Sequence, residues 1–157
     1  MARGKKNIPT MVPTEADKAY AAGFIDADGC ITVRFDRGNQ RKGAGESCFA
    51  SVTASQTKIP PLVFLRDRWG GSVRQLPRRR GNSSPAWEWG IVSQMAYAML
   101  EDIRPHLQIK GARADNALAL RAIRGGLPIG VPLSEDQLAQ HRAIKERAME
   151  LNKRGAV

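Results

Sequence analysis

Two pairs of alternating apolar and polar stretches restrict the fold of this chain more than any other feature. From Cys30 to Asp36 apolar and polar residues alternate, and the alternation returns over 47–54 after the basic loop RGNQRKGAGE. A period of two is typical of a strand with one buried and one solvated face, so two such strands around one loop predict an antiparallel hairpin. The segments SVRQL from Ser72 and AWEWGIVS from Ala86 predict a second hairpin.

Each predicted hairpin follows a segment with helical signals. Thr14 can cap a helix that should run to about Asp26 and stop before Gly29. Residues 59–69 carry proline near their start and Gly-Gly after their end, which predicts a short second helix. Helix-strand-strand therefore occurs twice, and the sequence predicts an α+β fold.

Further helices are expected after the second hairpin, and the last of them begins at a capping box formed by Ser134 and Gln137. The predicted helices cover 94–103, 111–123 and about 134–153. We expect a flexible basic arm over 1–13 and a single domain over 14–157, with its core at about 14–124 and a C-terminal helical extension at about 134–153.

Net charge favours a nucleic-acid partner. The chain has 25 Lys and Arg against 15 Asp and Glu, a formal charge of +10, and such an excess attracts phosphate polyanions. The two cysteines, Cys30 and Cys48, show no CxxC spacing, so we expect a reducing compartment, no zinc site and small core residues at both positions. The chain shows neither a signal-peptide core nor a run of transmembrane length, so we expect a soluble intracellular protein of open compartment.

The polar sides of the two hairpins are candidates for DNA contact, because a two-stranded ribbon fits the major groove. An ordinary solvated sheet face is the alternative, and the basic loops favour DNA. The candidate strand residues are Thr32, Arg34, Asp36, Ser47, Ser51, Thr53, Arg74 and Glu88. The candidate loop residues are Arg37, Gln40, Arg41, Lys42, Arg78, Arg79 and Arg80.

Two aspartates close the stretch AAGFIDADGC, and helical geometry keeps them apart. Asp26 and Asp28 are two residues apart, so on a helix they lie roughly 200° around the axis and cannot share a metal or a proton. One of them should have a local hydrogen-bonding role, and the other should lie where the chain turns into the first strand. One carboxylate holds Mg²⁺ weakly, so a second chain could supply the missing ligand.

Small residues precede these aspartates on one side of the helix. Ala19, Ala22, Gly23 and Asp26 have the spacing i, i+3, i+4 and i+7, which permits close approach of a facing helix. The facing helix could belong to the same domain or to a second chain, and the pattern does not distinguish the two.

The stretch AAGFIDADG, residues 21–29, resembles the signature of the LAGLIDADG homing endonucleases at seven of nine letters. The order of helices and hairpins over 14–124 also resembles the αββαββα core of that family, whose antiparallel sheet forms a DNA-binding saddle. SQTK at 55–58 and the segment 103–118 resemble two further regions. One copy of the motif is present, as in the homodimeric members of the family.

The resemblance implies a site-specific, Mg²⁺-dependent endonuclease for double-stranded DNA. Such an enzyme acts as a homodimer on a long pseudopalindromic target, leaves 3′ overhangs, needs no small-molecule cofactor or membrane, and is encoded in an intron or similar mobile element. Asp28 would bind the metal with the carbonyl of Ala27, Gln56 would position solvent, and Lys110 would stabilise charge or activate water. The small-residue stripe would form the dimer interface. An RNA maturase or a cleavage-inactive nucleic-acid-binding relative is the alternative.

Overall fold

The computed structural model describes residues 8–38, 45–78, 81, 84–124 and 131–153. The predicted DNA contacts Gln40, Arg41, Lys42, Arg79 and Arg80 lie outside these ranges. The elements follow in the order α1 (Glu15–Asp28), β1 (Gly29–Asp36), β2 (Ser47–Gln56), α2 (Pro60–Trp69), β3 (Ser72–Gln75), β4 (Trp87–Val92), α3 (Ser93–Ile103), a short 3-10 helix (Arg104–His106), α4 (Gly111–Arg124) and α5 (Glu135–Leu151).

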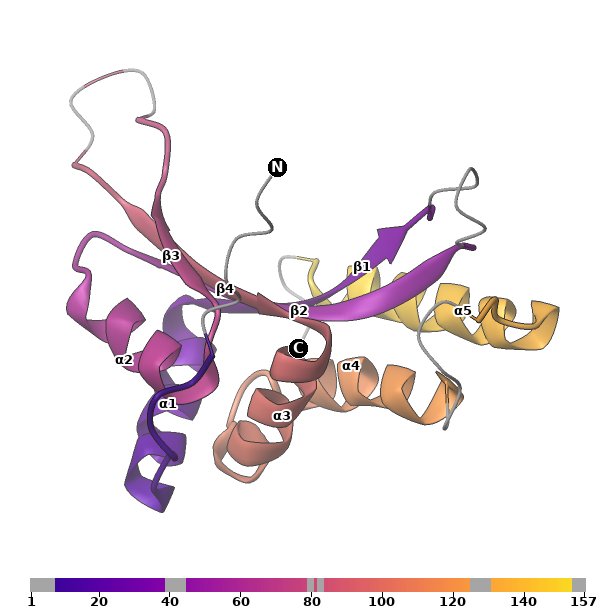
Figure 1. Ribbon diagram of the computed structural model, residues 1–157, viewed down its shortest axis with the longest axis horizontal. Helices are drawn as coiled ribbons and strands as arrows, with labels where there is room; N and C mark the ends of the chain where they lie inside the picture. The colour runs from indigo at the N-terminus through magenta and orange to yellow at the C-terminus, as the bar shows by residue number, and fades with distance from the viewer. Residues whose placement is uncertain (1–7, 39–44, 79–80, 82–83, 125–130, 154–157) are drawn as a thin grey trace.

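The four strands form one antiparallel sheet in the order β1-β2-β4-β3, so the second strand of each hairpin lies at the centre. The α-helices lie on one side of this sheet, and toward the hairpin loops the strands bend to the other side (Figure 1). The open face is therefore concave along the strands. The predicted α+β fold is confirmed.

Local signals in the sequence account for most element ends. Thr14 caps α1 as predicted and does so in a capping box with Asp17, and Ser134 forms the predicted capping box with Gln137 at the start of α5. Helix α1 continues to Asp28, two residues beyond the predicted end. Its last turn is stabilised by Gly29, whose N–H donates to the carbonyl of Ile25, and by the side chain of Lys110, which donates to the same carbonyl.

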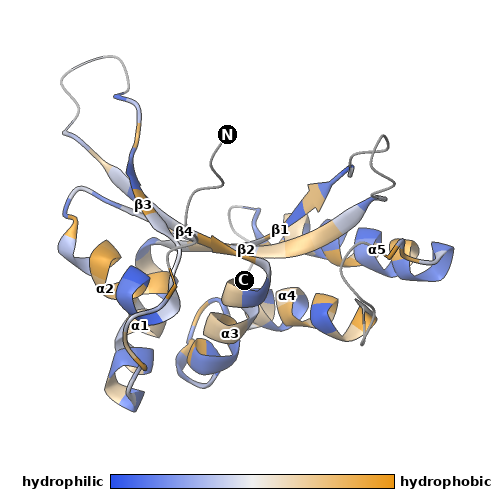
Figure 2. Ribbon diagram, viewed as in Figure 1, coloured by the Kyte–Doolittle hydropathy of each residue, from blue (hydrophilic) through white to orange (hydrophobic). Residues whose placement is uncertain are grey.

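The core lies between the sheet and the helices below it. Ile31, Val52 and Trp89 point from the strands into this layer and are almost fully buried, and Trp89 Nε1 donates to the carbonyl of Gly70 at 2.9 Å. Hydrophobic residues concentrate in the sheet and the inner helices, whereas α5 is predominantly hydrophilic (Figure 2). Gly71 has a φ of +88°, and a Cβ there would lie 2.4 Å from the carbonyl oxygen of Gly90, so only glycine fits this turn.

Helix α5 packs on the helix-covered side of the sheet and not on the open face. It packs against α4 and beneath the β1–β2 hairpin, where His141 Nδ1 accepts a hydrogen bond of 3.0 Å from the N–H of Cys48. Cys48 is buried, and burial raises the pKa of its thiol. Cys30 is exposed on the open face because strand alternation places it with Thr32, so the expectation of a core residue there is wrong. None of the described helices has the length and hydrophobicity needed to cross a membrane.

Candidate active site and nucleic-acid interface

Asp28 and Gln56 meet where α1 and β2 end. The Gln56 Nε2 donates to Asp28 Oδ2 at 2.6 Å, although the two residues are 28 positions apart in the sequence. The Gln56 Oε1 accepts from the N–H of Thr57 at 3.2 Å, which fixes the orientation of the amide. Asp28 is exposed and Gln56 is partly exposed, so the carboxylate keeps access to solvent.

Asp26 has the local role that helical geometry predicted for one of the two aspartates. Its carboxylate turns away from Asp28 and accepts from the backbone N–H groups of Gln108, Ile109 and Lys110 at 2.7, 3.2 and 2.9 Å. These N–H groups belong to the three residues directly before α4, so Asp26 fixes this segment and the start of the helix. The two carboxylates therefore have different partners: Asp28 pairs with Gln56, and Asp26 binds the backbone before α4.

The ammonium group of Lys110 lies against the C-terminal end of α1. The side chain is buried, with 8% exposure, and Nζ donates to the carbonyls of Ile25, Asp26 and Gly29 at 2.7, 2.8 and 2.7 Å. Three bonds use all three ammonium hydrogens. Burial lowers the pKa of Lys110, while the three bonds need the protonated form.

The charge-stabilising or water-activating role that the resemblance implies for Lys110 stays a prediction. Within the described residues, no hydrogen bond joins Lys110 to Asp28 or Gln56. Lys110 and Asp26 instead exchange caps: the lysine satisfies carbonyls at the end of α1, and the aspartate satisfies N–H groups at the start of α4. The carbonyl of Ala27 is not among the three that Lys110 occupies.

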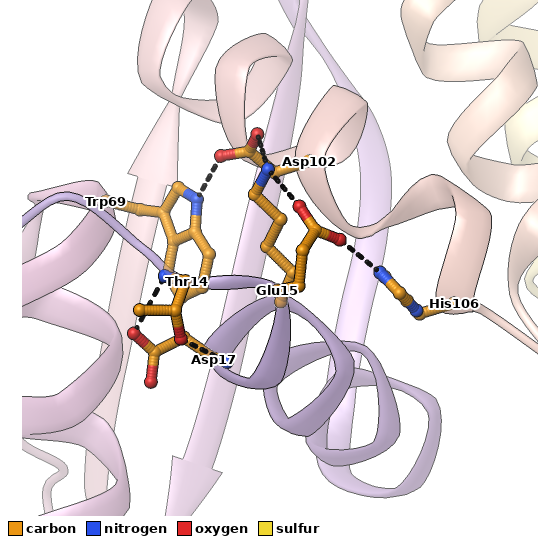
Figure 3. A network of polar contacts seen from close by, with 7 residues as sticks. Thr14, Glu15, Asp17, Trp69, Asp102 and His106 are labelled. Atoms are coloured by element: carbon orange, nitrogen blue, oxygen red, sulfur yellow. Dashed lines mark hydrogen bonds and ion pairs between the residues drawn. The ribbon is translucent and has the colours of Figure 1, made fainter.

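The N-terminal end of α1 is fixed by a second polar network (Figure 3). Lys18 pairs with Glu15 at 2.9 Å and with Asp102 of α3 at 3.4 Å, and the same Asp102 accepts from Trp69 Nε1 of α2 at 2.9 Å. Glu15 also contacts His106 at 3.4 Å. Both Lys18 and His106 lower the pKa of Glu15, the larger effect being the hydrogen bond from Lys18.

Between its anchored ends, α1 leaves a stripe of residues uncovered. The predicted stripe is partly wrong, because Ala22 is fully buried in the domain core and Asp26 is bonded to the start of α4. The uncovered α1 stripe has the spacing i, i+3, i+4, i+7 and i+11 and consists of Ala16, Ala19, Tyr20, Gly23 and Ala27. Ala19 and Gly23 belong to both stripes. A Cβ at Gly23 would meet no described atom within 4 Å, so the chain itself leaves space there.

The open face of the sheet carries most of the described residues that were predicted to contact DNA. Thr32, Arg34, Asp36, Thr53 and Arg74 point to this face and are exposed or partly exposed. Ser51 also belongs to this face, but it is only 1% exposed because Thr32 and Val92 flank it across the ladder. Ser51 still belongs to the lining of the pocket on this face, and its contact with DNA stays a prediction.

A shallow pocket of about 170 Å³ occupies the centre of the open face. Its lining includes Arg34, Thr53, Arg74 and Glu88, together with Ser72 and Val92, which the sequence reasoning did not select. Ser72 shares the strand phase of Arg74 and could have been found from alternation. Val92 shares the phase of Glu88, but an apolar residue on a polar side gave no such signal. The remaining predicted contacts, Arg37, Ser47 and Arg78, lie at the strand ends or in the loops.

Comparison with known proteins places this architecture among homing endonucleases. Neither a family model nor a curated protein matches the sequence. The structure of the homing endonuclease I-CvuI in complex with its target in the presence of Ca matches with a TM-score of 0.69 and 22% identity, over 91% of this chain and 87% of that chain. The archaeal intron-encoded homing endonuclease I-Vdi141I, complexed with DNA, matches with a TM-score of 0.64 and 17% identity, over 90% of this chain and 87% of that chain.

A third solved structure relates the chain to larger proteins of the same fold. The LAGLIDADG meganuclease I-AabMI, bound to uncleaved DNA, matches with a TM-score of 0.59 and 18% identity over 85% of this chain but 46% of that chain. The chain thus spans about half of that protein and most of the first two. It has the LAGLIDADG homing endonuclease fold, and the predicted αββαββα core is confirmed.

Proposed function

We propose that this chain is a site-specific endonuclease for double-stranded DNA that acts as a homodimer and requires a divalent metal ion. The observation that carries the proposal is the hydrogen-bonded pair Asp28–Gln56 at the solvent-accessible end of α1. That pair lies at the ends of α1 and β2, beside an uncovered stripe of small residues, in a domain whose sheet has a polar open face. A protein that only binds nucleic acid has no need of an exposed carboxylate positioned by an amide.

The residues at the end of α1 fit a hard cation such as Mg²⁺. Asp28 offers a carboxylate and Ala27 offers a carbonyl, and oxygen ligands are those that Mg²⁺ prefers. Among the described residues, no three His, Cys, Asp or Glu side chains gather as a metal-binding group. In the proposed dimer the second carboxylate is Asp28 of the other copy. A bound divalent ion supplies charge stabilisation and a more acidic water for phosphodiester hydrolysis.

The protein side of the mechanism consists of positioning and proton handling. In the proposed complex the anchored end of α1 would present Asp28 to the scissile phosphate, and Gln56 orients the carboxylate through Nε2. The Gln56 amide and the Asp28 carboxylate can together hold a water molecule in line for attack. We assign Lys110 and Asp26 to positioning, because their charged groups are committed to backbone atoms of α1 and of the segment before α4.

The uncovered α1 stripe is the proposed dimer interface. Ala16, Ala19, Gly23 and Ala27 have small side chains, which permit close contact with the same helix of a second copy. A two-fold axis through this contact would bring the two Asp28 carboxylates close together. It would also match a pseudopalindromic target, since half-sites mirror the symmetry of the protein. Cleavage with 3′ overhangs and an intron or mobile-element origin are parts of the same proposal.

Gly23→Leu is expected to convert the dimer to a monomer. A Cβ at this position meets no described atom within 4 Å and Gly23 is exposed, so the monomer should fold normally while the facing helix is pushed away. Light scattering measures the mass, and circular dichroism checks the fold. Ala122→Leu, on an exposed position of α4, is the matched control and should stay dimeric. A Gly23→Leu protein that remains a dimer would exclude this stripe as the interface.

The proposed activity is tested with a randomised library of double-stranded DNA incubated with the protein and Mg²⁺. Recovery of a small set of cut sequences with two related half-sites is the expected result. Selective binding without any cut product would identify the cleavage-inactive alternative, and preference for structured RNA over duplex DNA would identify a maturase. Omission of Mg²⁺ should abolish cutting, so that the library duplexes keep their full length.

A further inference from the structure

An ion pair between neighbouring strands stands in the shallow pocket of the open face. Arg74 of β3 and Glu88 of β4 lie directly opposite each other in the ladder. Arg74 Nε and Nη2 both donate to the same oxygen, Glu88 Oε1, at 3.2 and 2.7 Å. The Arg74 side chain is 70% exposed and that of Glu88 is 24% exposed.

The ion pair between Arg74 and Glu88 contributes little to the stability of the fold. An ion pair this exposed contributes little to the free energy of unfolding, because water screens the charges and both side chains lose conformational freedom. The pair does fix the direction of a long side chain that would otherwise sample many rotamers. Its main physical effect is therefore to orient Arg74.

The bonds to Glu88 leave one end of the guanidinium available. Arginine has five N–H donors, and the contact with Glu88 takes the edge formed by Nε and Nη2. Nη1 keeps both hydrogens and Nη2 keeps one, and one hydrogen of each nitrogen lies on the outer edge of the guanidinium. Two parallel donors at the tip of an arginine match the O6 and N7 acceptors of guanine in the major groove.

The negative charge of Glu88 favours the edge of a base over a phosphate as the DNA partner of Arg74. A carboxylate this close would repel a phosphate oxygen, whereas the edge of a base is uncharged. The pocket that contains the pair is otherwise lined by neutral side chains such as Thr53, Ser72 and Val92, with Arg34 as a second cation. This environment suits contact with base edges more than contact with the DNA backbone.

We propose that Arg74 reads one guanine in each half-site and that Glu88 is the positioning residue that orients Arg74 for this contact. The inference rests on the proposed function, because it requires the open face to bind duplex DNA. It revises the sequence prediction for Glu88, whose contribution is made through Arg74 rather than by its own contact with DNA.

The test is selection from the randomised duplex library with the wild-type protein, Arg74→Ala, Glu88→Ala and Glu88→Gln. Wild type should require guanine at one position per half-site. Arg74→Ala should lower that preference by about 5- to 150-fold, the range for one bidentate contact. Glu88→Ala should lower it at the same position and at no other, and Glu88→Gln should restore part of it because the amide oxygen still accepts from Arg74.

Arg78→Ala is the matched control, since it removes an exposed cation from the loop that follows β3. It should weaken binding to all sequences alike, with no loss at the Arg74 position. Affinity for unrelated DNA separates the two roles of Glu88: it should stay equal or rise in Glu88→Ala, because a negative charge is removed.

Three results would overturn the inference. Unchanged guanine preference in Arg74→Ala would show that Arg74 reads no base. A uniform loss of affinity in that variant, with a shallower salt dependence, would make Arg74 a phosphate contact. A changed preference in Glu88→Ala at a position that Arg74→Ala does not affect would make Glu88 a direct contact. If wild type selects no duplex sequence, the proposed function fails first and this inference fails with it.

Discussion

Asp28→Asn is expected to reduce cleavage by more than about 100-fold, the upper end for residues that only support a metal ligand. Asparagine has nearly the same size and its oxygen can still accept from Gln56 Nε2, so the end of α1 should keep its structure. The change removes the negative charge that a divalent ion requires. The initial rate of plasmid linearisation, with the target recovered from the library, measures the effect.

DNA affinity is the control for this variant. Asp28 lies at the end of α1 and the predicted base contacts lie on the sheet, so the dissociation constant from fluorescence anisotropy should stay within a few-fold of wild type. Asp26→Asn serves as a second control two residues away, since Asp26 bonds the backbone before α4. Asp26→Asn should lower the free energy of unfolding while changing the cleavage rate less than Asp28→Asn does. An Asp28→Asn protein that cuts at the wild-type rate would remove Asp28 from the mechanism.

Lys110→Met is expected to lower the free energy of unfolding by about 3 kcal/mol, because three carbonyls at the end of α1 lose a charged donor. Methionine preserves most of the buried side-chain volume, so the loss reports on the hydrogen bonds rather than on a cavity. Urea unfolding measures the change, at one protein concentration for all variants because dimerisation contributes to stability. Cleavage should fall as well, since the end of α1 holds Asp28.

Lys58→Met is the matched control for that measurement. Lys58 is exposed in the turn after β2, and its replacement should change the free energy of unfolding by no more than about 0.5 kcal/mol. The comparison also decides between two roles of Lys110. Wild-type stability together with lost cleavage would assign Lys110 to the chemistry, as the family resemblance implies, and would contradict the positioning role.

Local patterns in the sequence predicted the order and phase of the elements. Alternation from Cys30 to Asp36 identified the buried face of β1 because a strand places successive side chains on opposite faces. The caps at Thr14 and Ser134 depend on neighbours within four residues, and both were predicted. Features that depend only on nearby residues are available from the sequence.

Features that depend on the packing of distant segments could not be predicted from the sequence. Ser51 has the strand phase of an exposed residue, yet its flanking partners on β1 and β4 cover it. Ala22 has the helical phase of the predicted stripe, but α1 is rotated so that Ala22 meets the core and Tyr20 faces out. The ammonium of Lys110 reaches carbonyls more than 80 positions earlier in the chain. Helical geometry did predict that Asp26 and Asp28 would separate, without predicting which partner each would find.

The anchoring of α1 at both ends has a consequence for gene dosage. Because contacts within one chain anchor both ends of this helix, we expect a protomer to fold before it binds a second copy. In the proposed homodimer, the amount of active enzyme then rises with the square of protomer concentration at low expression.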